Sequence, residues 1–306
     1  MTTSMNKTVL SYFATGSQGN AMARAFAAAG FDVRTVTRDP SGDAARALKD
    51  AGVDVRAGDL SDPDSLAAAN TGVSIVALIV PFYHPQSATY MRNAVGAAKR
   101  AGAELIVFNT SSPIPERPAG HPSVDHRREL QNILEASGVP HITLVPGSYM
   151  ENLLGPWTAG PVREDDELSY PIPEGTGFSW IATRDVAALM IEAAKRPALA
   201  NTLLRIGGPE NLTGPEMAAS FSRALGRDIR WEYITPRELG DRCAAVIGQP
   251  AGNGLAEYYA TVQENIEDVV PFHDMGPILQ KLPVELTTLE TWVREHAALF
   301  TKSPEA

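Results

Sequence analysis

The segment with the clearest chemical potential is Phe13-Ala14-Thr15-Gly16-Ser17-Gln18-Gly19, which lies between an apolar run and an alanine-rich run. Glycines let a backbone approach phosphate groups, and the first turn of a helix offers free N–H groups and a favourable dipole. The spacing therefore predicts a diphosphate site for a dinucleotide, formed by Thr15, Gly16, Ser17, Gln18 and Gly19. The alternative is a strand-to-helix turn without a ligand, which the bulky Phe13 in the tight turn favours.

A second set of candidates follows the next apolar run, at Thr37-Arg38-Asp39-Pro40. Proteins that prefer NAD place Asp or Glu about 20 residues after the glycines, where the carboxylate binds the ribose hydroxyls. Arg38 could instead pair with a 2′-phosphate, because a guanidinium fork suits phosphate geometry. The pattern thus favours NADP(H), with Arg34 as a weaker second candidate. The alternative for Arg38 is a solvated side chain before a turn.

A third set, Val80-Pro81-Phe82-Tyr83-His84, follows a strongly apolar run. In open α/β sheets ligands bind at the carboxyl edge, where this segment would lie. We expect Val80, Pro81 and Phe82 to contact the cofactor, with Phe82 and Tyr83 covering the nicotinamide ribose. Packing within the loop is the alternative for these aromatic residues.

The elements that position these residues alternate between short apolar strands and amphipathic helices. Strands are expected at residues 8–13, 31–37, 53–57, 73–80, 104–109 and 139–145, with helices at 18–29, 43–51, 61–69, 87–101 and 122–136. Such alternation indicates parallel βαβ units with right-handed crossovers, and continuously apolar strands indicate helices on both faces. We therefore predict an α/β fold with a doubly wound parallel sheet of the Rossmann type.

The second half of the chain has a different character. Residues 147–177 are rich in proline, glycine, aromatic and acidic residues and show no sustained periodicity, which indicates a functional loop region. Helices are expected at 183–195, 213–225 and 289–300, and strands at 202–206 and 229–234. We predict a dinucleotide-binding domain at 1–150 and a smaller, mostly helical substrate lobe at 151–306, with about 181–208 returning to the first domain.

Composition excludes several classes of function. The net charge of -10 disfavours nucleic acid as a partner, because such binding relies on Lys and Arg. The single cysteine, Cys243, permits no intramolecular disulfide and suits a small core residue, and the six scattered histidines predict no metal site. Neither a signal peptide nor a membrane helix is apparent. We expect a cytoplasmic monomer or homodimer that binds a small-molecule substrate and no membrane.

Several motifs together resemble the NmrA-like family, an atypical branch of the short-chain dehydrogenase/reductase superfamily. They are Ala14-Thr15-Gly16-x-x-Gly19, Arg38-Asp39-Pro40, Pro146-Gly147-Ser148-Tyr149-Met150-Glu151-Asn152-Leu153 and Gly207-Gly208-Pro209-Glu210-Asn211-Leu212-Thr213. The resemblance covers most of the chain and implies NADP(H) as the cofactor. It also implies that Asp59 and Leu60 flank the adenine, although Asp59 could serve only as a helix cap.

The resemblance raises a question about catalysis. Conventional members of the superfamily use a Tyr and a Lys four residues apart on the helix after the fifth strand, where both lie on one face. The register from Leu134 and Gly138 puts Ser123 and Arg127 at these positions. Arg127 can hold a ribose or a phosphate, but its high pKa makes it a poor proton carrier.

Other groups could then supply a proton or bind a carbonyl. Ser111 offers a hydroxyl at the end of the fifth strand, with Thr110 and Ser112 beside it, and no activating base is evident. His126 and Tyr83 are the further catalytic candidates, because their segments converge on the carboxyl edge of the sheet. Each could equally be a surface or packing residue.

The substrate is expected to meet an apolar and aromatic wall. The side chains predicted to contact it are His84, Tyr149, Met150, Asn152, Leu153, Trp157 and Trp180. Such a wall suits a flat, fairly hydrophobic molecule, although the aromatic residues could instead form the core of the second lobe. The resemblance favours an NADPH-dependent reductase of a small carbonyl, quinone, enone or imine. The alternatives are a non-catalytic NADP(H) sensor and a non-redox isomerase, cyclase or dehydratase.

Overall fold

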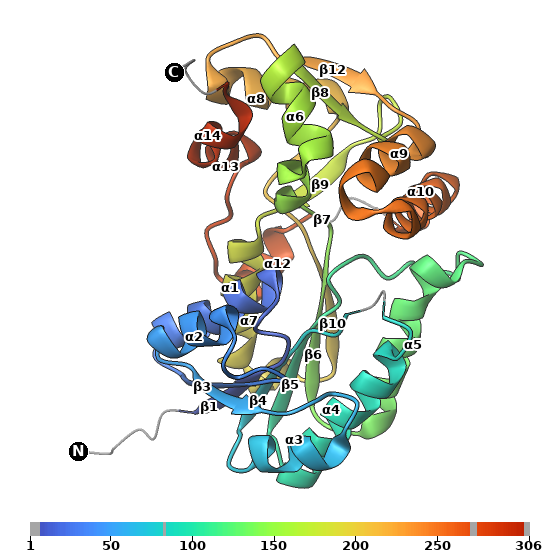
Figure 1. Cartoon of the computed structure of the whole chain (residues 1–306). Coiled ribbons are helices and arrows are strands. Elements are labelled where there is room, and N and C mark those ends of the chain that lie inside the picture. Colours follow the sequence, from blue (N-terminus) through green and yellow to red (C-terminus); the bar gives the residue numbers. More distant parts are fainter. Residues whose placement is uncertain (1–6, 82–83, 270–273, 303–306) are drawn as a thin grey trace.

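The computed structural model describes residues 7–81, 84–269 and 274–302. Figure 1 shows a lower part built on a twisted sheet and an upper part made mainly of helices. The first 150 residues form most of the lower part, and later segments reach both parts.

A seven-stranded parallel sheet forms the core of the lower part, in the order β10-β6-β5-β4-β1-β2-β3. Its strands are β1 (Thr8–Ser11), β2 (Asp32–Thr37), β3 (Asp54–Ala57), β4 (Ile75–Leu78), β5 (Leu105–Asn109), β6 (His141–Pro146) and β10 (Thr202–Ile206). Every pair in this sheet is parallel. The strand order reverses beside β1, which places a topological switch point where β1 meets β4. The predicted doubly wound Rossmann-type sheet is confirmed.

Helices cover both faces of this sheet (Figure 1). One face carries α1 (Ser17–Ala28), α2 (Asp43–Asp50) and α7 (Thr183–Ala194), and the other carries α3 (Pro63–Asn70), α4 (Ser87–Ala101) and α5 (Pro122–Ser137). Each layer has its own apolar core, with Phe26 and Met190 in the first and Leu66 and Met91 in the second. Central strands such as β4 are buried along their whole length, which explains why they read as continuous apolar runs.

The region 147–177 is not an irregular loop, and this expectation was wrong. It contains β7 (Ser148–Tyr149), a 3-10 turn η1 (Met150–Leu154), α6 (Pro156–Asp165) and β8 (Glu167–Tyr170). Two prolines obscured α6: Pro156 occupies its first turn, which tolerates proline, and Pro161 lies inside it. The strand β8 is completed by β12 (Arg230–Tyr233), more than sixty residues later in the chain, so no local pattern reveals it.

The upper part has a separate apolar core. It is built by α6, β9 (Phe178–Ile181), α8 (Gly214–Leu225), α9 (Pro236–Ile247), α10 (Gln249–Glu264), α13 (Leu289–Glu295) and α14 (Ala297–Phe300). The short strand β11 (Asn211–Leu212) pairs with β9. Helices α9 and α10 form a tight hairpin, in which a Cβ added at Gly252 would lie 2.4 Å from the carbonyl oxygen of Gly240. The hairpin therefore depends on bare glycine backbone at its crossing.

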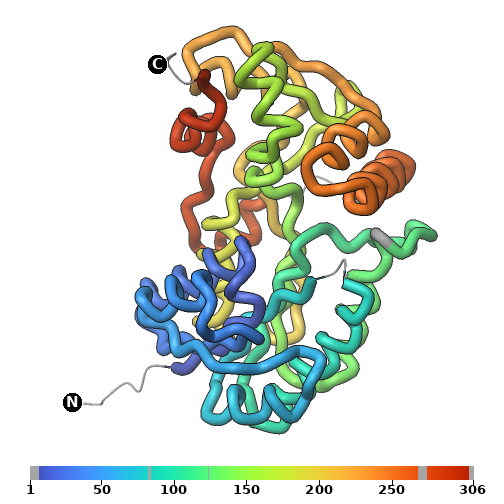
Figure 2. The backbone as a smooth tube through the Cα atoms, in the orientation of Figure 1, coloured from blue at the N-terminus to red at the C-terminus, as the bar shows by residue number. Residues whose placement is uncertain are grey.

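The chain crosses between the two parts several times, as the green, yellow and red stretches of Figure 2 show. After building β9 it returns to the sheet, where α7 packs on α1 and β10 pairs with β6. A later helix, α12 (Gly276–Lys281), lies beside Met275 and Leu282, both buried in the core of the lower part. The Glu151 carboxylate also connects segments that are distant in sequence. It accepts hydrogen bonds from the Thr183 amide at 3.1 Å and the Trp292 indole at 3.4 Å. A division into domains at residue 150 stays a prediction.

Candidate active site

The loop between β1 and α1 has the shape of a dinucleotide turn despite Phe13. Phe13 adopts a left-handed backbone conformation, with φ of 65°, which is the geometry that normally favours glycine. The Gly16 amide donates a hydrogen bond to the Phe13 carbonyl at 3.0 Å. A Cβ added at Gly19 would lie 2.1 Å from that same carbonyl oxygen, so only glycine lets α1 pass so close. The turn is thus preserved at the cost of a strained phenylalanine.

The Phe13 side chain lies close to the start of α1, with its Cδ1 3.8 Å from the position of a Cβ added at Gly16. It is half-buried and contacts the apolar cores on both faces of the sheet. Gly16 precedes the first turn of α1, and no side chain caps that helix. Thr15 and Ser17 are exposed beside it. The residues present therefore fit a diphosphate group at this helix N-terminus.

A first cavity of about 200 Å³ lies on one side of this loop. Its lining includes Phe13, Thr15, Val36, Arg38, Asp59, Leu60, His84 and Tyr90. Within the described part of the chain, no group accepts a hydrogen bond from Arg38, whose side chain is exposed. Arg34, by contrast, is held by Asp54 at 2.9 Å and by the carbonyl of Ala69 at 2.7 Å. Arg34 therefore has a structural role, and Arg38 is the guanidinium available to an anion.

Asp59 combines a loop role with a place in the cavity wall. Its carboxylate accepts hydrogen bonds from the Ser61 amide and hydroxyl, each at 2.8 Å. These bonds, together with the nearby charge of Arg38, lower the pKa of Asp59. Asp62, rather than Asp59, caps α3 through the Asp64 amide. The Asp59 carboxylate is therefore held ionised in the first cavity, next to Leu60.

The segment after β4 is only partly visible in this arrangement. Phe82 and Tyr83, predicted for the cofactor and for catalysis, lie outside the described residues. Val80 is buried in the core, and Pro81 is partly exposed. His84 lines the first cavity and stacks on Tyr90, with ring centroids 4.8 Å apart. The predicted substrate residue His84 therefore lies on the Arg38 side of the loop.

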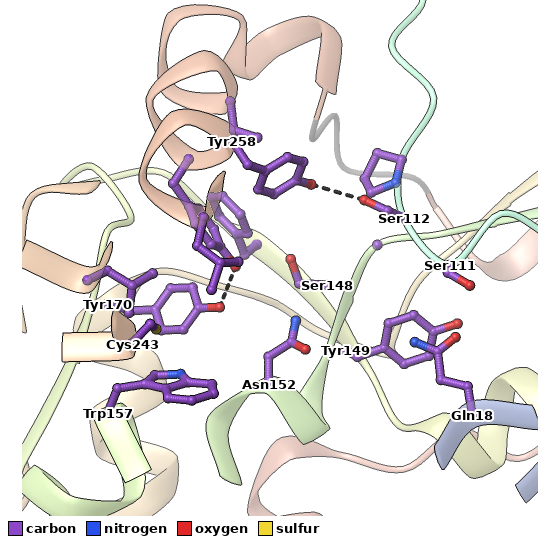
Figure 3. A pocket seen from close by; sticks show the side chains of 17 residues that line it. Gln18, Ser111, Ser112, Ser148, Tyr149, Asn152, Trp157, Tyr170, Cys243 and Tyr258 are labelled. Carbon is purple, nitrogen blue, oxygen red and sulfur yellow. Dashed lines mark hydrogen bonds between the residues drawn. The ribbon is translucent and has the colours of Figure 1, made fainter. Parts of the chain in front are cut away.

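A second, larger cavity of about 290 Å³ lies on the other side of the loop, between the two parts of the molecule. Figure 3 shows it lined by Gln18 at one end and by Trp157 and Tyr258 toward the other. The Gln18 side-chain oxygen and the Ser111 hydroxyl are buried atoms without a hydrogen-bond partner. Both belong to residues that line this cavity, so they are polar groups available to a bound molecule.

A short hydrogen-bond chain fixes the end of β5. The Ser111 amide donates to the Asn109 side chain at 2.8 Å, and the Asn109 amide group donates to the Tyr149 hydroxyl at 3.0 Å. Ser111 has a φ of 60°, which turns the chain sharply at the cavity wall. Burial raises the pKa of Tyr149. Tyr149 therefore stays protonated and acts as a neutral wall.

The predicted aromatic wall is divided between the cavity and the core. Tyr149, Asn152 and Trp157 line the second cavity. Met150, Leu153 and Trp180 do not, because η1 and β9 turn these three side chains into the apolar core of the upper part. The sequence pattern could not separate the two groups, because both alternate over a few residues on short elements.

Helix α5 separates two predicted residues. Arg127 is buried, with 1% exposure, and its guanidinium carbon lies 5.5 Å from the centroid of the Tyr258 ring. His126 faces α4 instead. Its ring contacts the Ser87 hydroxyl on that helix and the Glu129 carboxylate on its own helix. Adjacent residues of a helix point about 100° apart, so His126 turns away when Arg127 turns inward. His126 is not among the residues that line the second cavity.

The α9–α10 hairpin closes the second cavity, which no motif in this part of the chain predicts. Cys243, Tyr258 and Tyr259 line the cavity, and the Tyr258 hydroxyl lies 3.0 Å from the Ser112 hydroxyl. Burial raises the pKa of Cys243 to about 11, which fits the predicted packing role rather than that of a nucleophile. The aromatic pair Tyr258-Tyr259 on an amphipathic helix was the available signal.

Residues 7–81, 84–269 and 274–302 contain no cluster of three or more His, Cys, Asp or Glu side chains arranged to hold a metal ion. Among the helices within the same ranges, none has the length and apolarity needed to span a bilayer.

Comparisons with known proteins give a consistent result. The sequence profile of the NmrA-like family matches residues 5–293. An NAD(P)H azoreductase of Xenophilus azovorans is 31% identical over 294 residues, which cover 94% of this chain and 96% of that protein. The crystal structure of an NADPH-dependent quinone oxidoreductase from Escherichia coli, complexed with NADPH, aligns with a TM-score of 0.77 at 21% identity, covering 95% of this chain and 99% of that one. The negative transcriptional regulator NmrA, solved with NADP, aligns with a TM-score of 0.78 at 21% identity and covers 95% of both chains.

Proposed function

Because the chain belongs to the NmrA-like family, we propose that it is an NADPH-dependent reductase of flat, mainly apolar, electron-poor molecules. The observation that carries this proposal is the pair of cavities on either side of the β1–α1 loop. Phe13 and Thr15 line one of them, and Gln18 lines the other. A dinucleotide whose diphosphate sits on this loop extends in both directions along the carboxyl edge of the sheet.

The cofactor side is assigned from charge and shape. Arg38 would bind the 2′-phosphate, Asp59 and Leu60 would flank the adenine, and residues 15–19 would hold the diphosphate. Arg127, buried on α5, would hold the ribose near the reactive ring. When bound, NADPH supplies a hydride at the Gln18 end of the second cavity. The relative named an NAD(P)H azoreductase, which spans nearly the whole chain, supports this choice of cofactor.

The substrate side is assigned from the cavity walls. Trp157, Tyr170 and Phe178 provide flat apolar surface, while Ser111 and Asn152 provide a few polar contacts. This combination suits an aromatic substrate with one or two polar atoms. Quinones and azo compounds, the substrates named for two relatives, have this character, as do enones and imines.

The loss of the usual tyrosine and lysine is compatible with reduction. Hydride transfer depends mainly on positioning, and the two cavities meet that need. Ser123 and Arg127 replace the acid and its partner on α5. The remaining requirement is a proton for the substrate.

The first test separates binding from turnover. Calorimetric titration with NADPH and then NADH should show tighter binding of NADPH, and 1,4-naphthoquinone or an azo dye should then drive steady oxidation of NADPH. Absence of binding by either dinucleotide would remove the proposal and would leave a non-redox reaction in the second cavity.

A second candidate function is a non-catalytic NADP(H) sensor. The replacement of the Tyr and Lys positions by Ser123 and Arg127 favours it, as does the likeness to a transcriptional regulator that was solved with NADP. This function predicts tight binding that differs between NADP⁺ and NADPH, with no turnover of any acceptor in the panel.

A further inference from the structure

Tyr258 reaches the second cavity from a part of the chain far from the dinucleotide motif. Its hydroxyl lies 3.0 Å from the hydroxyl of Ser112, which follows β5. Its ring lies against the guanidinium of Arg127, with 5.5 Å between the guanidinium carbon and the ring centroid. Figure 3 shows the Tyr258 side chain pointing from α10 toward Ser112 at the cavity wall. Three segments thus bring a phenol, a hydroxyl and a cation together.

The placement of Tyr258 follows from the packing of the hairpin. Helix α10 packs on α5 and crosses α9 at Gly240 and Gly252, where there is no space for a Cβ. This close crossing fixes the position of α10 relative to α9. Tyr258 projects from the side of α10 that faces the cavity, whereas Glu257 beside it lines a surface groove on the other side.

We propose that Tyr258 donates the proton that completes reduction of the substrate, in place of the tyrosine missing from α5. Arg127 would offset the negative charge left on the phenolate, because a guanidinium over an aromatic ring is attracted to it and stays protonated. Ser112 orients the Tyr258 hydroxyl. This proposal rests on the proposed reductase function.

The proposed proton transfer from Tyr258 applies to a carbonyl substrate and to an azo substrate alike. With NADPH bound as proposed, a hydride carrying two electrons would add to one atom of the C=O or N=N bond, and the π-electron pair would move to the other atom. That atom forms a bond to the proton of Tyr258 as the phenolic O–H bond breaks, and the electron pair of that bond stays on the phenolate oxygen. Water then returns a proton to the phenolate.

The other three tyrosines of the cavity are less suited to this role. The Tyr149 hydroxyl is buried against Asn109, and burial raises its pKa. The hydroxyls of Tyr170 and Tyr259 contact each other, so each of these phenols is engaged by the other. Tyr258, by contrast, lies over the guanidinium of Arg127.

Two variants distinguish a proton-donating role of Tyr258 from a purely structural one. Tyr258→Phe removes the proton and the contact with Ser112, whereas Ser112→Ala removes the contact and keeps the proton. With 4-nitrobenzaldehyde as substrate, Tyr258→Phe should lower kcat by about 100-fold or more, with KM changed little. Ser112→Ala should lower kcat by less than about fivefold, the effect of one lost hydrogen bond.

A quinone provides an internal control. Reduction of 1,4-naphthoquinone leaves a phenolate-type anion that is stable in water, whereas reduction of an aldehyde leaves a strongly basic alkoxide. Tyr258→Phe should therefore retain most of its quinone turnover. Equal losses in both variants and with both substrates would show that Tyr258 only latches the hairpin and would overturn the proposal.

A readout without turnover completes the test. The carbonyl stretch of 1,4-naphthoquinone bound to the protein should shift to lower frequency through the Tyr258 hydrogen bond. The shift should persist in Ser112→Ala and disappear in Tyr258→Phe, and its persistence in Tyr258→Phe would refute the role. NADPH titration of wild type and Tyr258→Phe should agree within threefold. Failure of wild type to bind NADPH would count against the reductase function itself, while the infrared result would still report on Tyr258.

Discussion

The two cavities on either side of the β1–α1 loop are built in opposite ways. The first is formed by loops that follow β1, β2, β3 and β4, all within the first 90 residues. The second collects side chains from residue 18 to residue 262, on elements of both parts of the molecule. The first cavity therefore depends only on local turns, whereas the shape of the second changes whenever a distant helix shifts.

The largest effect is expected in the shared loop. Gly19→Ala places a Cβ 2.1 Å from the Phe13 carbonyl oxygen, so the loop must move. We expect a loss of about 3 kcal/mol in stability and at least 100-fold weaker NADPH binding by calorimetry. Gly16→Ala is the matched control for stability, because its Cβ would make an ordinary contact at 3.5 Å. Equal thermal midpoints for the two variants would contradict this account.

A smaller effect, confined to the second cavity, is expected at the hairpin crossing. Gly252→Ala puts a Cβ 2.4 Å from the Gly240 carbonyl oxygen, which separates α9 from α10 and displaces Tyr258. We expect kcat/KM for an aldehyde or azo substrate to fall by roughly 30-fold, about 2 kcal/mol, while the Kd for NADPH stays within threefold.

The control for this prediction lies two residues away on the same helix. Gly254→Ala meets no atom within 4 Å and should keep full activity with slightly higher stability. If Gly252→Ala weakened NADPH binding as much as turnover, the two cavities would not be separable.

A tenfold effect on NADPH affinity is expected when the Arg38 guanidinium of the first cavity is removed. Arg38→Ala should weaken NADPH binding by about 1.4 kcal/mol or more, a factor of ten, and should leave NADH binding unchanged because NADH lacks the 2′-phosphate. Arg237→Ala, a change at an exposed arginine on α9, is the control. Parallel losses for both dinucleotides would place Arg38 away from the 2′-phosphate.

The smallest expected effect is a loss of stability at alkaline pH, which we attribute to one of two buried phenols near the cavities. Tyr12 lies under the β1–α1 loop, and burial raises its pKa from 10.0 to about 12. Because the folded pKa lies above the unfolded value, the stabilisation is complete below pH 10 and is lost as the pH rises from 10 toward 12. Urea unfolding at pH 9 and pH 11 should show that Tyr12→Phe removes about 1 kcal/mol of this alkaline loss. An unchanged alkaline loss in Tyr12→Phe would exclude Tyr12 as its source, and Tyr149 under the second cavity would be examined next.

The difference between the locally built first cavity and the second cavity also explains which features could be predicted from the sequence. The sheet, its covering helices and the NmrA-like resemblance were confirmed, because each rests on periodicity and turn residues within a few positions. Arg38, Asp59 and Leu60 line one cavity as placed by their loops, although their contacts with a cofactor remain predictions. The helix α6 and the strand β8 were missed, since two prolines disguise one and a remote partner strand completes the other.

The second cavity was less predictable for a physical reason. Trp157 and Trp180 look alike in sequence, yet one lines the cavity and the other is 2% exposed in the core. The fate of each depends on the packing of β9 and α6 against helices that come later in the chain. The position of Tyr258 at the cavity depends on the packing of α10 against α5, which no local sequence pattern predicts.

The return of the chain to β10 also constrains how this protein can be made. Until residue 206 has left the ribosome, β6 lacks its outer neighbour β10, and its backbone groups remain an open edge. Exposed edges of apolar strands pair with other chains and aggregate. A fragment that stops at residue 150 would keep that edge permanently, so it should precipitate although it contains the whole dinucleotide motif. Folding of the lower part is thus completed by a strand that is synthesised after the first segment of the upper part.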